Sequence, residues 1–116
     1  MDLNALVYWN AALLANFNSM LGNVTKAKQY REKADEIKAA VTAVLWNEKW
    51  GTWLDYDIAD NKPREYFYPS NLAPLWTYCY NMVSWFIMIL TPGPGENFPP
   101  NINNIIVNNS KFHNLQ

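Results

Sequence analysis

The sequence predicts a mainly α-helical fold in which a covered helix is followed by a helix at the surface. Apolar residues recur three and four positions apart over most of the first 45 residues, which is the spacing of amphipathic helices. No charged residue occurs between Leu3 and Thr25, whereas charges of both signs crowd Lys26–Lys38. Because a helix without charges is poorly suited to water, we infer two concentric layers, the first helix lying inside and the second outside.

The first helix is predicted over Leu3–Leu21. Asp2 can cap its N-terminus, and Gly22 can end it because glycine readily adopts positive φ. Most apolar positions follow the helical period, and the other side chains are small or uncharged. We therefore expect this helix to be covered on most of its sides.

The second helix is predicted over Lys26–Leu45, with Thr25 as its N-cap. It has one dry stripe, formed by Ala27, Tyr30, Ala34, Ile37, Val41 and Val44, and one charged face. The short connection Gly22–Val24 makes the two helices an αα-hairpin.

After Trp46 the helical period stops, and Asn47–Gly51 is predicted to turn into an extended piece, Thr52–Asp57. A period of two would place Trp53, Asp55 and Asp57 on one side of it. A third helix is expected from about Leu72, with Asn71 as N-cap and Pro74 within the first turn, where a missing N–H is harmless.

The chain is expected to divide at residue 80. Residues 1–80 form the patterned unit, whereas residues 81–116 begin with an apolar stretch, Met82–Leu90, and continue into a Pro- and Asn-rich tail that we expect to be poorly ordered. The apolar stretch is shorter than the about 20 residues that a membrane-spanning helix needs. No secretory signal is recognised at the start of the sequence.

Composition narrows the classes of function. The formal net charge is −1 and the basic residues alternate with acids, so nucleic acid is not an expected partner. With one cysteine, Cys79, and one histidine, His113, neither a disulfide framework nor a zinc site is expected. We predict that Cys79 is a small buried hydrophobe.

A calcium loop is also not expected. Asp55, Asp57 and Asp60 supply oxygens, but the twelfth position counted from Asp55 is Tyr66, where such a loop needs glutamate. We therefore predict no metal ligand and no cofactor.

Four linked motifs resemble the trehalases, and most closely an animal enzyme. They are DLNA from Asp2, LGN from Leu21, LWNEKWGTWLDYD from Leu45 and REYFYPSNLAPLW from Arg64, and the resemblance runs from Asp2 to about Tyr80. Trehalases are inverting glycoside hydrolases that split α,α-trehalose into two glucose molecules. The resemblance implies a fragment of an (α/α)6 barrel, and a parent enzyme that is extracellular or anchored on the outside of a membrane.

The same resemblance implies that this chain is inactive alone. In trehalases the acid is an aspartate in a segment before DLNA and the base a glutamate in a glycine-rich segment after PLW, and neither segment occurs here. No catalytic residue is therefore predicted, and trehalose is expected as a partner only of a complete enzyme.

The resemblance places Asp2, Asn4 and Trp46–Ser70 on the side of the barrel that carries the cleft, although no substrate contact is assigned to any residue. For Asp55 and Asp57 we favour a structural role, capping the loop or pairing with Arg64 or Lys62. Lining the cleft is the alternative.

The alternative function is a non-catalytic interaction module. A tetratricopeptide-like array is one form, although such arrays need several hairpins at a period of about 34 residues; an inactive trehalase-derived binding protein is the other. Apolar flanks on Leu3–Leu21 and Tyr66–Leu90 predict self-association or a partner chain.

Two acceptor patterns for N-glycosylation occur, Asn23-Val24-Thr25 and Asn108-Asn109-Ser110. The first falls in the predicted helix turn, which should be exposed. Asn23 is therefore the candidate glycosylation site.

Overall fold

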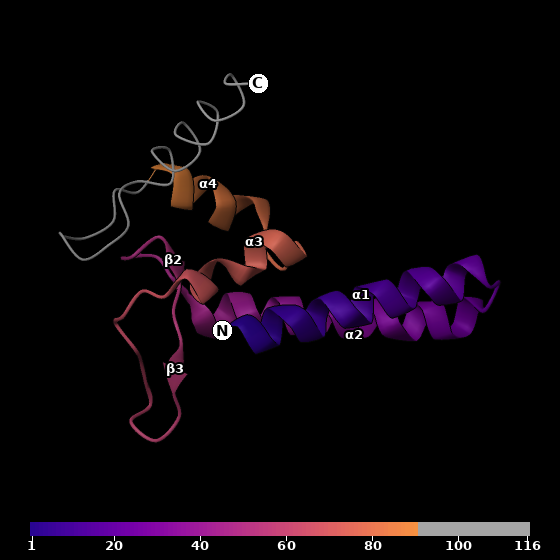
Figure 1. The fold of residues 1–116 in the computed structure, drawn as a ribbon, viewed down its shortest axis with the longest axis horizontal. Helices are drawn as coiled ribbons and strands as arrows, with labels where there is room; N and C mark the ends of the chain where they lie inside the picture. Colours follow the sequence, from indigo (N-terminus) through magenta and orange to yellow (C-terminus); the bar gives the residue numbers. More distant parts are fainter. Residues whose placement is uncertain (91–116) are drawn as a thin grey trace, which may run out of the picture.

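The protein is described by a computed structural model over residues 1–90; the expectation for the tail concerns residues outside this range. The described part is mostly helical, as predicted. Its elements are α1 (Asp2–Met20), α2 (Val24–Leu45), β1 (Trp46–Asn47), β2 (Thr52–Trp53), β3 (Tyr56–Asp57), β4 (Lys62–Pro63), a 3₁₀ turn (Pro69–Leu72), α3 (Ala73–Thr77) and α4 (Met82–Leu90). α1 and α2 form a long antiparallel hairpin, and the later elements gather near the end that carries the N-terminus (Figure 1).

The ends of the hairpin helices differ from the prediction in two places. Asp2 lies inside α1 with Met1 as the N-cap, and its carboxylate accepts a hydrogen bond from the N–H of its neighbour Leu3. α2 begins at Val24, two residues early, because Asn23 rather than Thr25 is the cap: Asn23 Oδ1 accepts from the N–H of Lys26 at 3.2 Å. Asparagine is at least as good an N-cap as threonine. Gly22 ends α1 with φ at +74°, as predicted.

The hairpin interface is built mainly from alanine. Ala5, Ala11 and Ala15 are the buried residues of α1, and they lie opposite a helix whose buried residues are Ala34 and Val41. Larger apolar side chains of α1 stay outside the interface, with Leu3 70% and Met20 75% exposed. The expectation that α1 is covered on most sides is therefore wrong for the described residues, because only alanines of α1 are fully buried.

Two short ribbons replace the predicted single extended piece. β1 pairs with β2, placing Trp46 opposite Trp53, and β3 pairs with β4, placing Asp57 opposite Lys62. Both Trp53 and Leu54 are buried, so the predicted alternation fails. The reason is that the chain leaves one ribbon after Trp53 and enters another at Tyr56, which interrupts the period of two.

The third helix exists but is only five residues long. Pro74 lies in its first turn as predicted, but the N-cap is Leu72; Asn71 belongs to the preceding 3₁₀ turn and is fully buried. α3 ends at Tyr78, whose φ is +60°. The apolar stretch that follows forms α4, and the side chain of Asn81 accepts a hydrogen bond from the N–H of Ser84 in its first turn.

The core lies where the start of α1, the end of α2, β2 and α3 meet. Its buried members are Ala5, Val41, Trp53, Ala73 and Cys79. Cys79 is fully buried, as predicted, and burial raises the pKa of its thiol to about 11. This thiol therefore acts as an apolar filler at neutral pH.

Candidate functional site

The segments that the sequence places on the cleft side come together at one end of the helix hairpin. The start of α1, the two ribbons and the 3₁₀ turn lie at this end, with the β3–β4 ribbon projecting away from the helices (Figure 1). We call this end, which comprises residues 1–4 and 41–72, the base of the hairpin. That the base faces a substrate cleft remains a prediction.

Asp57 is fully engaged within its own ribbon. Its Oδ1 accepts from the N–H groups of Ala59 at 3.0 Å and Asp60 at 3.2 Å, and its Oδ2 accepts from Nε and Nη2 of Arg64 at 3.2 and 2.9 Å. The hydrogen bond from Asp60, followed by that from Arg64, holds the pKa of this carboxyl below its ordinary value. The predicted pairing with Arg64 is confirmed, whereas Lys62 pairs with Asp60 at 3.0 Å.

Asp55 ties the ribbons to the start of α1. Its Oδ1 accepts a hydrogen bond from the amino group of Met1, and its carbonyl oxygen accepts from the N–H of Arg64 at 2.7 Å. Asp55 and Asp57 therefore both hold the backbone of the base in place. The Asp57 carboxylate, whose two oxygens are both occupied, is poorly placed to move a proton.

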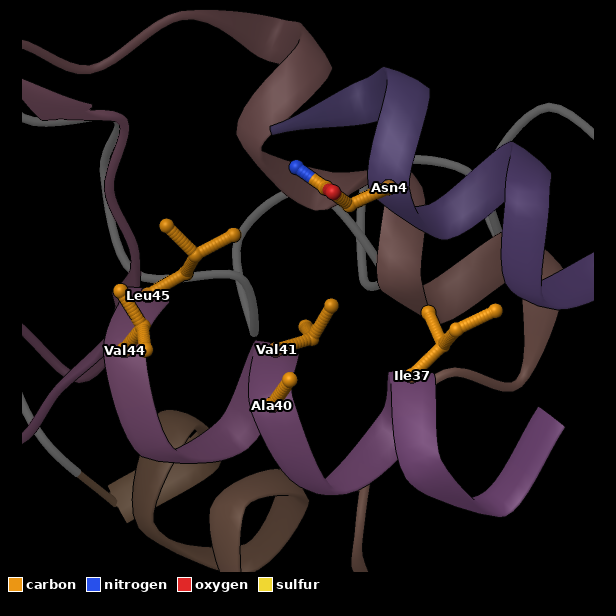
Figure 2. A pocket seen from close by; sticks show the side chains of 6 residues that line it. All are labelled: Asn4, Ile37, Ala40, Val41, Val44 and Leu45. Carbon is orange, nitrogen blue, oxygen red and sulfur yellow. The ribbon is translucent and has the colours of Figure 1, made fainter. Parts of the chain in front are cut away.

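An apolar pocket of about 270 Å³ lies between the start of α1 and the last turns of α2. Figure 2 shows the amide of Asn4 reaching over side chains that α2 presents to the pocket. These are Ile37, Ala40, Val41, Val44 and Leu45. The lining contributed by residues 1–90 contains no titratable side chain, so this part of the pocket suits apolar groups and offers no acid or base.

A second hollow follows the β3–β4 ribbon and is wider, at about 640 Å³. Charged side chains of the ribbon, such as Lys62 and Glu65, stand beside Tyr66 and Tyr68, which are exposed. Exposed rings with polar groups at their edges are able to stack on a sugar and bind its hydroxyls. No motif in the sequence points to these tyrosines; the available signal is the absence of charge from residues 66–70.

Three buried polar atoms in the base have no hydrogen-bond partner among the described residues: Thr52 Oγ1, Trp53 Nε1 and Asn71 Oδ1. β2 and the 3₁₀ turn are in contact, so these atoms belong to neighbouring elements. An unsatisfied buried polar group costs about 1–3 kcal/mol. The base thus has hydrogen-bonding capacity that water or a further segment would satisfy.

Residues 1–90 offer neither a membrane span nor a metal-binding cluster. None of the helices in this range combines the length and hydropathy that crossing a bilayer requires. Groups of three or more His, Cys, Asp or Glu side chains able to hold a metal ion are likewise absent from this range.

Comparison with known proteins finds similarity to one family, the trehalases. A sequence model of the trehalase family matches residues 1–88, which extends beyond Tyr80 into α4. The chain is 51% identical over 81 residues to a trehalase of Apis mellifera, covering 70% of this chain and 13% of that protein. It is 45% identical over 80 residues to a trehalase of Homo sapiens, covering 69% and 14%.

A bacterial relative, named periplasmic trehalase in Salmonella paratyphi C, is 39% identical over 75 residues, covering 65% of this chain and 13% of that protein. The chain therefore spans only 13–14% of the length of these curated relatives.

Proposed function

Because this chain belongs to the trehalase family, we propose that it is a segment of an enzyme that splits α,α-trehalose into two glucose molecules. The observation that carries the proposal is the family match over residues 1–88, within a mostly helical structure. In this proposal α1 and α3 belong to the inner layer of an (α/α)6 barrel and α2 to the outer layer. The absence of charge from α1 after Asp2 and the charged face of α2 support that assignment.

We further propose that the segment positions the wall of the cleft and supplies neither the catalytic acid nor the base. An inverting glycosidase needs a protonated carboxyl on one face of the bond and a carboxylate that activates water on the other, about 6.5–9.5 Å apart. Asp57 has a lowered pKa and both oxygens engaged, and the carbonyl oxygen of Asp55 accepts a hydrogen bond from the N–H of Arg64. These contacts support a positioning role, so the 116-residue chain is proposed to be inactive alone.

The proposed location of the parent enzyme is outside the cytoplasm, either secreted or anchored on the outer side of a membrane. Support comes from the relatives named periplasmic trehalase. Fractionation of cells producing the native transcript, with detection of the protein by an antibody against α2, tests the location. Recovery only in the cytosolic fraction contradicts it.

The proposal is tested by a chimera. Residues 1–80 replace the matching segment of the Apis mellifera enzyme, and glucose release from trehalose is measured as kcat and KM. Because the segment is proposed to position rather than react, the chimera should keep kcat within about tenfold, which corresponds to about 1.4 kcal/mol of barrier. A folded chimera without activity would contradict the proposal.

A second assay addresses the chain by itself. The purified 116-residue chain should release no more glucose from trehalose than a mock purification does. Glucose release that appears only with the purified chain would overturn the proposed inactivity.

A second candidate function is favoured by one observation, the exposed apolar side chains of α1. Leu3, Phe17 and Met20 are each more than half exposed, and large apolar side chains gathered at a surface mark sites of association. We propose that a free chain would self-associate or bind a partner chain through α1. Light scattering that shows a monomer at every protein concentration would contradict this proposal. A tetratricopeptide-like array would need several helix hairpins, and residues 1–90 contain one, α1–α2.

A further inference from the structure

We propose that the hollow beside the β3–β4 ribbon binds a pyranose sugar, with the rings of Tyr66 and Tyr68 as its stacking surfaces. Its volume of about 640 Å³ lies within the range of about 300–1,000 Å³ that is typical of small-molecule sites. Tyr66 is 70% and Tyr68 52% exposed, and the ribbon beside them projects away from the helices (Figure 1). The choice of glucose as the sugar rests on the proposed function; the shape and chemistry of the hollow do not.

The backbone presents both tyrosines on one side of an extended segment. Tyr68 has φ at −123° and ψ at 150°, which is extended backbone, and side chains two positions apart in such a segment point the same way. Both rings line the same hollow, and Phe67 between them is half-buried rather than exposed. The two Cα atoms are then roughly 7 Å apart, which is close enough for both rings to contact one disaccharide.

A buried asparagine holds this segment from behind. Asn71 is fully buried, its backbone N–H donates to the carbonyl oxygen of Tyr68 at 2.8 Å, and its Nδ2 donates to that of Tyr66 at 3.4 Å. Both hydrogen bonds use the backbone of the tyrosines and leave their rings available. Side chains that are positioned before the ligand arrives lose less conformational entropy when it binds.

The charges of the hollow favour a neutral ligand. Among the described residues of its lining, two basic side chains balance two acidic ones, namely Lys62, Arg64, Asp57 and Glu65. Arg64 pairs with Asp57 at 2.9 Å. Lys62 and Glu65 pair with other residues of the base, at 3.0 and 3.9 Å. A phosphate or carboxylate would have to compete with these pairs, whereas sugar hydroxyls can both donate to the carboxylates and accept from the cationic groups.

A pyranose matches the two features of the hollow together. The C–H groups on the faces of its ring can pack on the faces of the tyrosine rings, and its hydroxyls point outward to the charged side chains. An acyclic polyol such as sorbitol carries similar hydroxyls but has no ring face. Comparing a pyranose with sorbitol therefore separates stacking on the tyrosines from hydrogen bonding alone.

The experiment measures sugar binding to the purified 116-residue chain by saturation-transfer NMR, which works for an associated chain as well as for a monomer. Methyl α-glucopyranoside and trehalose should bind with dissociation constants on the order of 1 mM, and saturation should reach the C–H protons of the ring. Sorbitol should not bind. Raising NaCl from about 0.1 to about 1 M should change the Kd less than about twofold, because the ligand carries no charge to be screened.

Matched variants locate the binding on the tyrosines. Tyr66→Ala and Tyr68→Ala should each weaken binding about tenfold, because each loses the apolar contact with the sugar. Tyr66→Phe keeps the ring and should change the Kd less than about threefold. Trp76→Ala is the control, since Trp76 is an exposed aromatic residue of α3 that does not line the hollow. Circular dichroism checks that every variant is folded.

Three results overturn the proposal. They are a folded chain that binds neither sugar, sorbitol binding as tight as that of the glucoside, and equal weakening in Tyr66→Ala and Trp76→Ala. The outcome is separable from that of the proposed function. A chain that binds no sugar beside an active chimera refutes this site and leaves the proposed function standing, whereas a chain that binds sugar beside a folded, inactive chimera does the reverse.

Discussion

The two ribbons at the base of the hairpin are similar in size and are held by opposite means. In the β1–β2 ribbon, the rings of Trp46 and Trp53 meet edge to face with centroids 5.0 Å apart, and Trp53 is fully buried in the core. In the β3–β4 ribbon, an exposed network around the Asp57 carboxylate joins Ala59, Asp60 and Arg64. The first ribbon is thus coupled to the whole fold, whereas the second is closed locally and should open by itself.

Trp53→Ala should have the largest effect, because it removes the largest fully buried side chain of the described residues from the core. Truncation of a buried tryptophan costs about 3–5 kcal/mol. The measurement is the free energy of unfolding from urea denaturation followed by circular dichroism. Trp76→Ala is the matched control, since Trp76 is 67% exposed; an equal loss in both variants would break the contrast between buried and exposed tryptophans.

The rate at which the Cys79 thiol is labelled reports whether the core around Trp53 is closed, and it can be compared with the state of the β3–β4 ribbon. A thiol whose pKa is raised from 9.0 to about 11 has roughly 100-fold less thiolate at pH 8. Labelling of the folded chain should therefore be at least about 100-fold slower than in urea. Trp53→Ala should speed labelling because both residues belong to the core, and Asp57→Asn should not. Equal acceleration by both variants would show that the ribbons are coupled.

Asp57→Asn should open the β3–β4 ribbon and leave the helices intact. The substitution removes the charge that binds Arg64, so amide hydrogen exchange should accelerate over residues 56–64 and stay unchanged in α1 and α2. Asp60→Asn is the control, because the Asp60–Lys62 pair is exposed on both sides and such pairs contribute little. A loss of helical protection in Asp57→Asn would mean that this ribbon, too, supports the whole fold.

Acidification should affect the same ribbon reversibly. The folded pKa of Asp57 lies below the ordinary value of 3.8, so its contribution is fully present above pH 3.8 and is lost as the pH falls through the folded pKa. Exchange over residues 56–64 in the wild type should then approach that of Asp57→Asn, after correction for the intrinsic pH dependence of exchange. Asp57→Asn itself should not show this acid-induced acceleration of exchange. An acceleration of equal size in Asp57→Asn would assign the titration to another group.

The local sequence pattern predicted the secondary-structure elements better than it predicted which side chains are buried. The helical period of α1 and α2, the turn at Gly22 and the pairing of Asp57 with Arg64 all depend on residues near one another in sequence. The N-cap was misplaced because Asn23 and Thr25 are both good caps two positions apart. Burial of Asn71 and exposure of Leu3 depend on what packs against them from distant segments, which no local pattern contains.

The candidate site was predictable only in part. The resemblance to the trehalases placed Trp46–Ser70 on the same side of the barrel as Asp2 and Asn4. In the structure Trp53 and Ala5 of α1 belong to one core, and the cleft side itself remains a prediction. The break between the two ribbons, and with it the hollow beside Tyr66 and Tyr68, depends on two strand pairings whose register a single sequence does not determine. The KM of the chimera tests whether these tyrosines contact the sugar, but only together with the rest of the segment.

The alanine interface of the hairpin also bears on how the protein is made. Its contacts join residues that are all within the first 45, so the hairpin can close during synthesis, soon after α2 leaves the ribosome, without waiting for any later segment. The large apolar side chains of α1 remain uncovered at that moment. We therefore expect chaperones to bind this stretch of the nascent chain until further segments cover α1.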